Sequence, residues 1–103
     1  MDLSNGVRIR TSQDSEARTI FDGYVYSIII SKNNTHTILV QHGNFFTVYK
    51  NLSEIYVTKG EKLNIKQPLG KIATDKLSGQ TILSFSIFNN GIAQDPSYWI
   101  YKM

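Results

Sequence analysis

The chain has 103 residues, the length of one domain with a small hydrophobic core. Hydrophobic residues make up 41% and charged residues 18% of it, a composition typical of a folded globular protein. The lack of cysteine excludes disulfide bonds, thiol nucleophiles and thiolate-bound zinc. A net charge of +3 from scattered basic residues predicts no nucleic-acid partner. No apolar run approaches the roughly 20 residues of a membrane-spanning helix, so we expect no membrane insertion by this domain.

The first half of the chain consists of strand patterns. Residues 7–10 alternate apolar and polar side chains, and residues 18–21 form a short extended pattern. Residues 23–30 are rich in β-branched and aromatic side chains, which favour strands. Two more strands are predicted at 35–41 and 45–49.

Turn residues separate these later strands. Asn33-Asn34 precedes the strand at 35–41, and Gly43-Asn44 follows it. Asparagine and glycine tolerate the positive φ angles that tight hairpin turns require. The pattern therefore predicts two consecutive hairpins.

The second half continues in the same way. Short strands are predicted around 63–65 and at 69–73, and a longer one at 81–88. Alternation along the longer strand places Leu83, Phe85 and Ile87 on one face and Ile82, Ser84, Ser86 and Phe88 on the other. No segment shows helical periodicity. The fold class predicted is all-β, an antiparallel β-sandwich or open barrel formed by a single domain over residues 1–103.

The residue types alone give no support for catalysis. His36 and His42 lie on one predicted strand, about 20 Å apart at about 3.3 Å per residue, which is too far for a shared metal ion. No serine lies in a Gly-x-Ser-x-Gly motif, and no glycine-rich phosphate loop is present. Asp14, Glu16 and Asp22 fall in turn-like stretches, where we expect them to be solvated.

Six segments in chain order resemble the motifs of the LytM-type, lysostaphin-like zinc endopeptidase domain. They are residues 5–9 (His-x-Gly-x-Asp), 21–25 (Ala-Asp-Gly-x-Val), 40–52 (the His-Gly-Asn to Tyr-x-His-Leu segment), 57–70 (the Val-x-x-Gly to Gly-Gln-x-Ile-Gly segment), 83–87 (the core of His-Leu-His-Phe-Glu-Ile) and 95–99 (the closing Asp-Pro motif). The resemblance covers nearly the whole chain. It implies the lysostaphin-type, duplicated hybrid motif architecture.

The positions that hold zinc in this family carry other residues here. By the resemblance, the first zinc histidine falls on Ser4, the zinc aspartate on Arg8 and the last zinc histidine on Ser84. Two further family histidines fall on Asn51 and Ile82. Zinc catalysis depends on the ion lowering the pKa of its bound water, and Arg8 places a cation where that ion belongs. We therefore expect no metal, no cofactor and no peptidase activity.

Two other positions bear on the resemblance. His42 matches a family position that is not a metal ligand, so it does not restore a zinc site. Lys66 replaces a family glycine, which puts only the conformation of that turn in question.

Metal-free members of this family resemble murein hydrolase activators of bacterial cell division, which dock a segment of a peptidoglycan amidase. The resemblance therefore implies a partner-binding groove in place of the active site. Its expected lining is Ser4, Arg8, Tyr49, Asn51, Ile82, Ser84 and Ser86. We expect Arg8 to matter most, because a guanidinium can bind an acidic side chain through two hydrogen bonds.

Two alternatives remain open from the sequence. The domain could be a passive peptidoglycan-binding module, or a zinc endopeptidase with non-standard ligands. The resemblance implies a periplasmic or other extracytoplasmic location. It also implies that residues 1–103 are the C-terminal domain of a longer exported protein, because no signal peptide precedes them.

Overall fold

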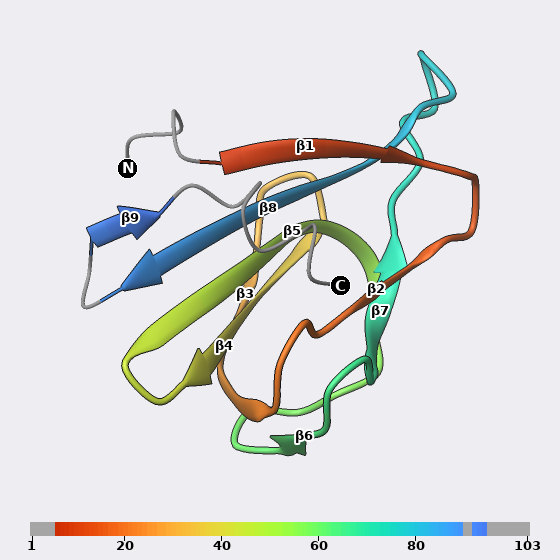
Figure 1. Cartoon of the computed structure of the whole chain (residues 1–103). Coiled ribbons are helices and arrows are strands. Elements are labelled where there is room, and N and C mark those ends of the chain that lie inside the picture. The colour runs from red at the N-terminus through yellow and green to blue at the C-terminus, as the bar shows by residue number, and fades with distance from the viewer. Residues whose placement is uncertain (1–5, 90–91, 95–103) are drawn as a thin grey trace.

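The computed structural model describes residues 6–89 and 92–94 of the chain, and its strands there join in one antiparallel sheet (Figure 1). The strands are β1 (Gly6–Thr11), β2 (Glu16–Arg18), β3 (Gly23–Ile30), β4 (His36–His42), β5 (Phe45–Ile55), β6 (Lys62–Leu63), β7 (Pro68–Ile72), β8 (Thr81–Asn89) and β9 (Ile92–Gln94). The all-β prediction is confirmed.

The long strand β5 gives the sheet its shape. The main layer has the order β1-β8-β5-β4-β3-β6, and β9 pairs with the end of β8. The first part of β5 pairs with β4 and β8, whereas Leu52–Ile55 pairs with β7, which in turn pairs with β2. Figure 1 shows β5 curving between these partners. The sheet therefore folds over at β5 and forms an open sandwich.

The hydrophobic core lies inside this fold. Its members are Ala17, Ile20, Val25, Ile38, Val40, Tyr49, Leu52, Val57, Leu63, Leu69, Ile72, Leu83, Phe85 and Ile87. The alternation predicted for β8 is confirmed, because Leu83, Phe85 and Ile87 all face the core. Burying each large apolar side chain contributes about 1.5–3 kcal/mol, so the core is the main source of stability.

Three strand predictions were wrong in their bounds. The short strand expected around 63–65 is β6, Lys62–Leu63, and Ile65 lies in the turn that follows it. The short strand expected at 18–21 is β2, Glu16–Arg18, and it ends before Thr19. Thr19 instead exchanges backbone hydrogen bonds with Gln67 and Lys66 in the turn before β7. The strand expected at 45–49 continues to Ile55, because a positive φ of 76° at Asn51 bends it without ending it.

The turns follow their residue types. Asn34 has a φ of 66° between β3 and β4, and Gly43 has a φ of 67° between β4 and β5. Both hairpins are therefore confirmed. Lys66 also has a positive φ, 67°, so the turn keeps a glycine-like conformation although lysine occupies it.

Candidate functional site

A groove of about 770 Å³ lies where β1, β8, the bend of β5 and the loop between β7 and β8 meet. Four residues of the predicted groove line it together: Arg8, Asn51, Ile82 and Ser84. The rest of its wall is polar and comes mainly from residues 33–35 and 73–80. The structure thus brings together four of the predicted residues, which are far apart in the chain.

The strand register explains why these side chains meet. Arg8 lies opposite Ser84 across β1 and β8, and Ser84 lies opposite Lys50 across β8 and β5. Ile82 and Ser84 are two residues apart on β8, so they share a face. That face is the one opposite to Leu83 and Phe85, which lie in the core.

Tyr49 does not line this groove. It is only 1% exposed, and its register partner is the core residue Phe85, so its ring faces the interior. Its hydroxyl accepts a hydrogen bond from the Ile20 N–H at 3.4 Å, and burial raises the pKa of the Tyr49 hydroxyl. Ser86 is also buried, at 5% exposure, and lies outside the groove lining. Ser4 lies outside the described residues.

Asn51 holds the base of the groove together. Its side-chain amide donates to the carbonyl oxygen of Ile82 at 2.7 Å and, more weakly, to that of Ala73 at 3.4 Å. The backbone carbonyl of Asn51 accepts from the Ala73 N–H at 2.8 Å. Asn51 therefore links β5, the end of β7 and β8, and its amide protons are used in structural bonds.

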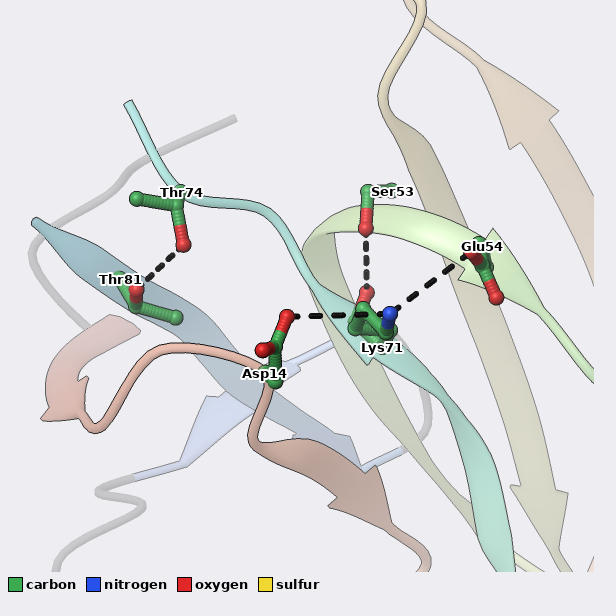
Figure 2. A network of polar contacts seen from close by, with 6 residues as sticks. All are labelled: Asp14, Ser53, Glu54, Lys71, Thr74 and Thr81. Atoms are coloured by element: carbon green, nitrogen blue, oxygen red, sulfur yellow. Dashed lines mark hydrogen bonds and ion pairs between the residues drawn. The ribbon is translucent and has the colours of Figure 1, made fainter. Parts of the chain in front are cut away.

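The loop from 73 to 80 forms one wall and is braced internally. The Asp75 carboxylate accepts hydrogen bonds from the Leu77 N–H at 3.0 Å and the Ser78 hydroxyl at 3.1 Å. The hydroxyls of Thr74 and Thr81 are joined at 2.6 Å where the loop begins and ends (Figure 2). This wall of the groove is therefore fixed by several hydrogen bonds rather than by side-chain packing.

A second polar cluster surrounds Lys71 on β7. Figure 2 shows the Lys71 ammonium between the carboxylates of Asp14 and Glu54, at 3.7 and 3.8 Å. The Ser53 hydroxyl donates to the Lys71 carbonyl oxygen at 3.4 Å. Both carboxylates are largely exposed, so these ion pairs contribute little to stability.

Four cations at the groove have no acidic partner in the described part of the chain: Lys76 in the loop wall, and three more on the neighbouring strands. We call Arg8, Arg10 and Lys50 the cationic rim. Arg10 is two residues from Arg8 on β1 and lies opposite Ile82, and it lines a shallower extension of the groove with Arg8. Among the residues described, no carboxylate hydrogen-bonds or forms an ion pair with these three.

The described carboxylates all have other partners. These are Lys71 for Asp14 and Glu54, Arg18 for Glu16, the Ile65 N–H for Asp22, the Thr58 N–H and the Gln67 amide for Glu61, and the Leu77 N–H and Ser78 hydroxyl for Asp75. No carboxylate among the described residues therefore neutralises the cationic rim by direct contact. Sequence reasoning found Arg8 and missed Arg10 and Lys50.

The residues in this groove do not fit a zinc ion. Zinc in proteins binds histidine nitrogen, cysteine thiolate or carboxylate oxygen. Arg8 carries a positive charge, Ile82 has no donor atom, and the Asn51 amide is engaged elsewhere. Across residues 6–89 and 92–94, no three histidine, cysteine, aspartate or glutamate side chains come close enough to hold a metal ion.

The two histidines have separate structural contacts. His36 Nδ1 lies 3.2 Å from the Leu52 carbonyl oxygen. His42 Nδ1 donates to the Asp22 carbonyl oxygen at 2.8 Å, and its Nε2 accepts from the Thr47 hydroxyl at 2.7 Å. Burial lowers the pKa of His42, although the Asp22 carbonyl and carboxylate oppose that shift. Both histidines lie outside the groove lining.

The bent antiparallel sheet is similar to the fold of lysostaphin. The structure superposes on lysostaphin with a TM-score of 0.82 and 21% identity, over 95% of this chain and 43% of that one. The catalytic domain of lysostaphin from Staphylococcus simulans gives a TM-score of 0.75 and 21% identity, over 94% of this chain and 78% of that one.

The SpoIIQ–SpoIIIAH pore-forming complex also contains a similar chain. It matches with a TM-score of 0.68 and 28% identity, over 77% of this chain and 52% of that one. The present chain thus spans about half of that protein and less than half of lysostaphin. No curated protein sequence matches it.

The model of peptidase family M23 matches residues 2–96. Because that match covers almost the whole sequence, the chain belongs to peptidase family M23. The described part of the chain contains no helix long and apolar enough to cross a membrane.

Proposed function

We propose that this chain is a non-catalytic LytM-type domain that binds and activates a peptidoglycan hydrolase, such as an amidase, during cell-wall remodelling or cell division. The observation that carries the proposal is the cationic rim of Arg8, Arg10 and Lys50 beside a groove with no zinc-binding donor set. Zinc hydrolysis needs a metal-bound water, and Asp75 is the one usual zinc ligand among the described residues that line this groove.

The groove suits an acidic segment of a partner protein. Its volume and polar walls accommodate side chains of a docked segment, and the rim supplies positive charge, while the Asp75 carboxylate in the loop wall is bonded within its own loop. Arg8 can bind a carboxylate through two parallel hydrogen bonds, which gives both attraction and orientation. The domain then acts outside the cytoplasm, where peptidoglycan is remodelled, as part of a longer exported protein.

The test is amidase activation on dye-labelled sacculi, using the amidases of the organism that encodes this chain. Arg8→Glu reverses the charge at the centre of the rim, and we expect it to abolish dye release. Lys62→Glu is the matched control, because it makes the same charge change on β6, outside the groove lining. Full activation by Arg8→Glu would falsify the groove assignment.

The alternative is a passive peptidoglycan-binding module. It is favoured by the exposed aromatic side chains Tyr24 and Tyr26, at 54% and 53% exposure, which could stack on glycan. A pull-down with purified sacculi and no amidase separates the two functions. Retention of the chain on sacculi together with no effect on any amidase would favour the passive module.

A further inference from the structure

One edge of strand β3 is covered for only part of its length. β4 pairs with β3 along one edge, whereas β6 pairs with the other edge only at Gly23 and Tyr24. Val25 then bonds to the chain just before β6, through Glu61 and Gly60. Beyond Val25, none of the described strands pairs with this edge. No described strand therefore covers residues 26–30 on this side, and we call them the free edge of β3.

The backbone groups that point out from this edge can be identified. The Ser31 N–H donates to the Thr35 carbonyl oxygen, so Ser31 faces β4. In an antiparallel pair, alternate residues face the partner strand, so Ile29 and Ser27 also face β4. Ile28 and Ile30 consequently direct their N–H and C=O groups toward the free edge, where a new strand could bond to all four.

The side chains along this edge are apolar and exposed. Tyr26 is 53%, Ile29 50% and Ile30 66% exposed, and residues 26–30 contain no charged residue. Proteins commonly protect such an edge with lysine or proline on the strand itself, or with a covering segment. Among the described residues, the protection at this edge is the bulge at Tyr26, whose ring packs edge-on against Phe46.

The charges at the two ends of the edge determine which kind of strand can pair with it. Lys32 follows one end, and Lys59 precedes Gly60 at the other. Two copies of the chain pairing antiparallel through this edge would bring Lys32 of one copy toward Lys59 of the other. Like charges at these positions disfavour such a dimer and favour a strand with acidic ends.

We infer that the free edge of β3 binds one extended strand of a partner protein, with an apolar centre and acidic ends, by adding it to the sheet. Backbone bonds to Ile28 and Ile30 supply the pairing, and Tyr26, Ile29 and Ile30 supply the apolar contact. The inference does not depend on the groove, because the two sites involve different strands of the sheet.

The test uses amide hydrogen exchange measured by NMR on the whole chain. The probe is a short synthetic peptide, blocked at both ends, that alternates valine and threonine between two terminal glutamates. A second peptide with terminal lysines is the matched control. Near saturation with the first peptide, we expect exchange of the Ile28 and Ile30 amides to slow by about tenfold or more. The lysine-ended peptide should give little protection.

Two variants and one control variant make this test more specific. Ile30→Pro removes an outward N–H without removing a bond to β4, so the protection at Ile28 should be lost. Lys32→Glu combined with Lys59→Glu changes only surface charges, so it should fold normally and should now prefer the lysine-ended peptide. Leu77→Lys, at a side chain 97% exposed elsewhere, should bind like the wild type.

Three outcomes overturn the inference. They are no protection at Ile28 and Ile30 by the glutamate-ended peptide, equal protection by both peptides, and protection that grows with protein concentration in the absence of peptide. The last result would identify a second copy of the chain as the occupant.

Discussion

Arg8 and Ser84 face each other directly across strands β1 and β8, and the side chain next to Ser84 on its other side is Lys50. In the LytM-type resemblance, the first two positions are those of a zinc aspartate and a zinc histidine. Two directly opposed side chains are close enough to bind one metal ion, and the residues at these two positions are an arginine and a serine. Placing zinc-binding side chains at these positions tests whether the fold can still hold a metal ion there.

We predict that Ser4→His, Arg8→Asp and Ser84→His together create a zinc site. Directly opposed side chains have Cβ atoms about 5 Å apart, and zinc lies about 2 Å from each ligand atom. The new side chains at positions 8 and 84, which oppose each other, can therefore reach one ion. Elemental analysis after purification should show about one zinc per chain in the variant and almost none in the wild type.

The control for this prediction moves the carboxylate along the strand. Arg10→Asp replaces Arg8→Asp in an otherwise identical variant, and because Arg10 lies opposite Ile82 it should not support stoichiometric zinc. Stoichiometric zinc in the wild-type protein would contradict both this prediction and the proposed non-catalytic function, and it would favour an endopeptidase with non-standard ligands.

Gly70 is predicted to be intolerant of a side chain. A Cβ atom added there would clash with the backbone oxygen of Glu54 on the paired strand β5, and backbone cannot move aside easily. Gly70→Ala should lower the free energy of unfolding by about 3 kcal/mol, as measured by urea denaturation.

Gly43→Ala provides the comparison. An added Cβ at Gly43 meets nothing within 4 Å, and only its φ of 67° opposes the change. The loss should be about 1 kcal/mol. Equal losses at the two positions would show that close packing of β5 against β7 does not govern Gly70.

Much of this fold could be predicted from local sequence patterns, because the bounds and faces of a strand depend mainly on residues that are neighbours in the chain. The strand expected at 23–30 has the bounds of β3, and the faces of β8 follow from its alternation. The extension of β5 was missed because Asn51, at positive φ, interrupts the period of two. Propensity alone treats such a position as the end of a strand.

The candidate site was predicted only in part, for a related reason. Arg10 could have been found, since it alternates with Arg8 on the same strand. Lys50 and Tyr49 could not be assigned correctly, because the face of each depends on the register between β5 and β8. Those strands are separated by the whole β6–β7 segment, and no local pattern fixes their register.

Lys66 offers a prediction about backbone strain. Its φ of 67° is unfavourable for lysine, and the local bonds that involve it use its backbone: its N–H donates to Thr19 and its carbonyl oxygen accepts from Arg18. Lys66→Gly should therefore stabilise the protein by about 0.5–1 kcal/mol, because relief of strain exceeds the added entropy of the unfolded chain.

The matched change is Lys62→Gly in β6, where the backbone is extended. It should destabilise the protein by about 0.5–1 kcal/mol. Thermal or urea unfolding of the two variants thus distinguishes strain at one lysine from a general effect of glycine. Destabilisation by both variants would mean that the side chain of Lys66 makes a stabilising contribution of its own.

The last prediction concerns pH and His42. The neutral imidazole suits its surroundings, because Nδ1–H donates to the Asp22 carbonyl oxygen and Nε2 accepts from the Thr47 hydroxyl. Protonation would place a hydrogen on Nε2 and remove that acceptor. Burial, the largest effect, lowers the pKa of His42 in the folded state below its ordinary value of 6.5.

The lowered pKa of His42 in the folded state determines how the free energy of unfolding changes with pH. As pH falls through about 6.5, the unfolded chain takes up a proton at His42 before the folded chain does. The stabilising contribution is therefore complete above that pH and is lost progressively below it, until the pH reaches the lower folded-state pKa. His42→Phe should remove this component, since an aromatic ring can keep the contacts with Phe21 and Phe45.

Urea denaturation of both proteins between about pH 7.5 and about pH 5 measures the difference, because carboxylates titrate mainly below that range. The wild type should lose stability toward pH 5 more steeply than His42→Phe. Identical slopes would show that His42 does not discriminate between its protonation states on folding, and that its two hydrogen bonds persist, or are replaced at no net loss, when the ring is charged.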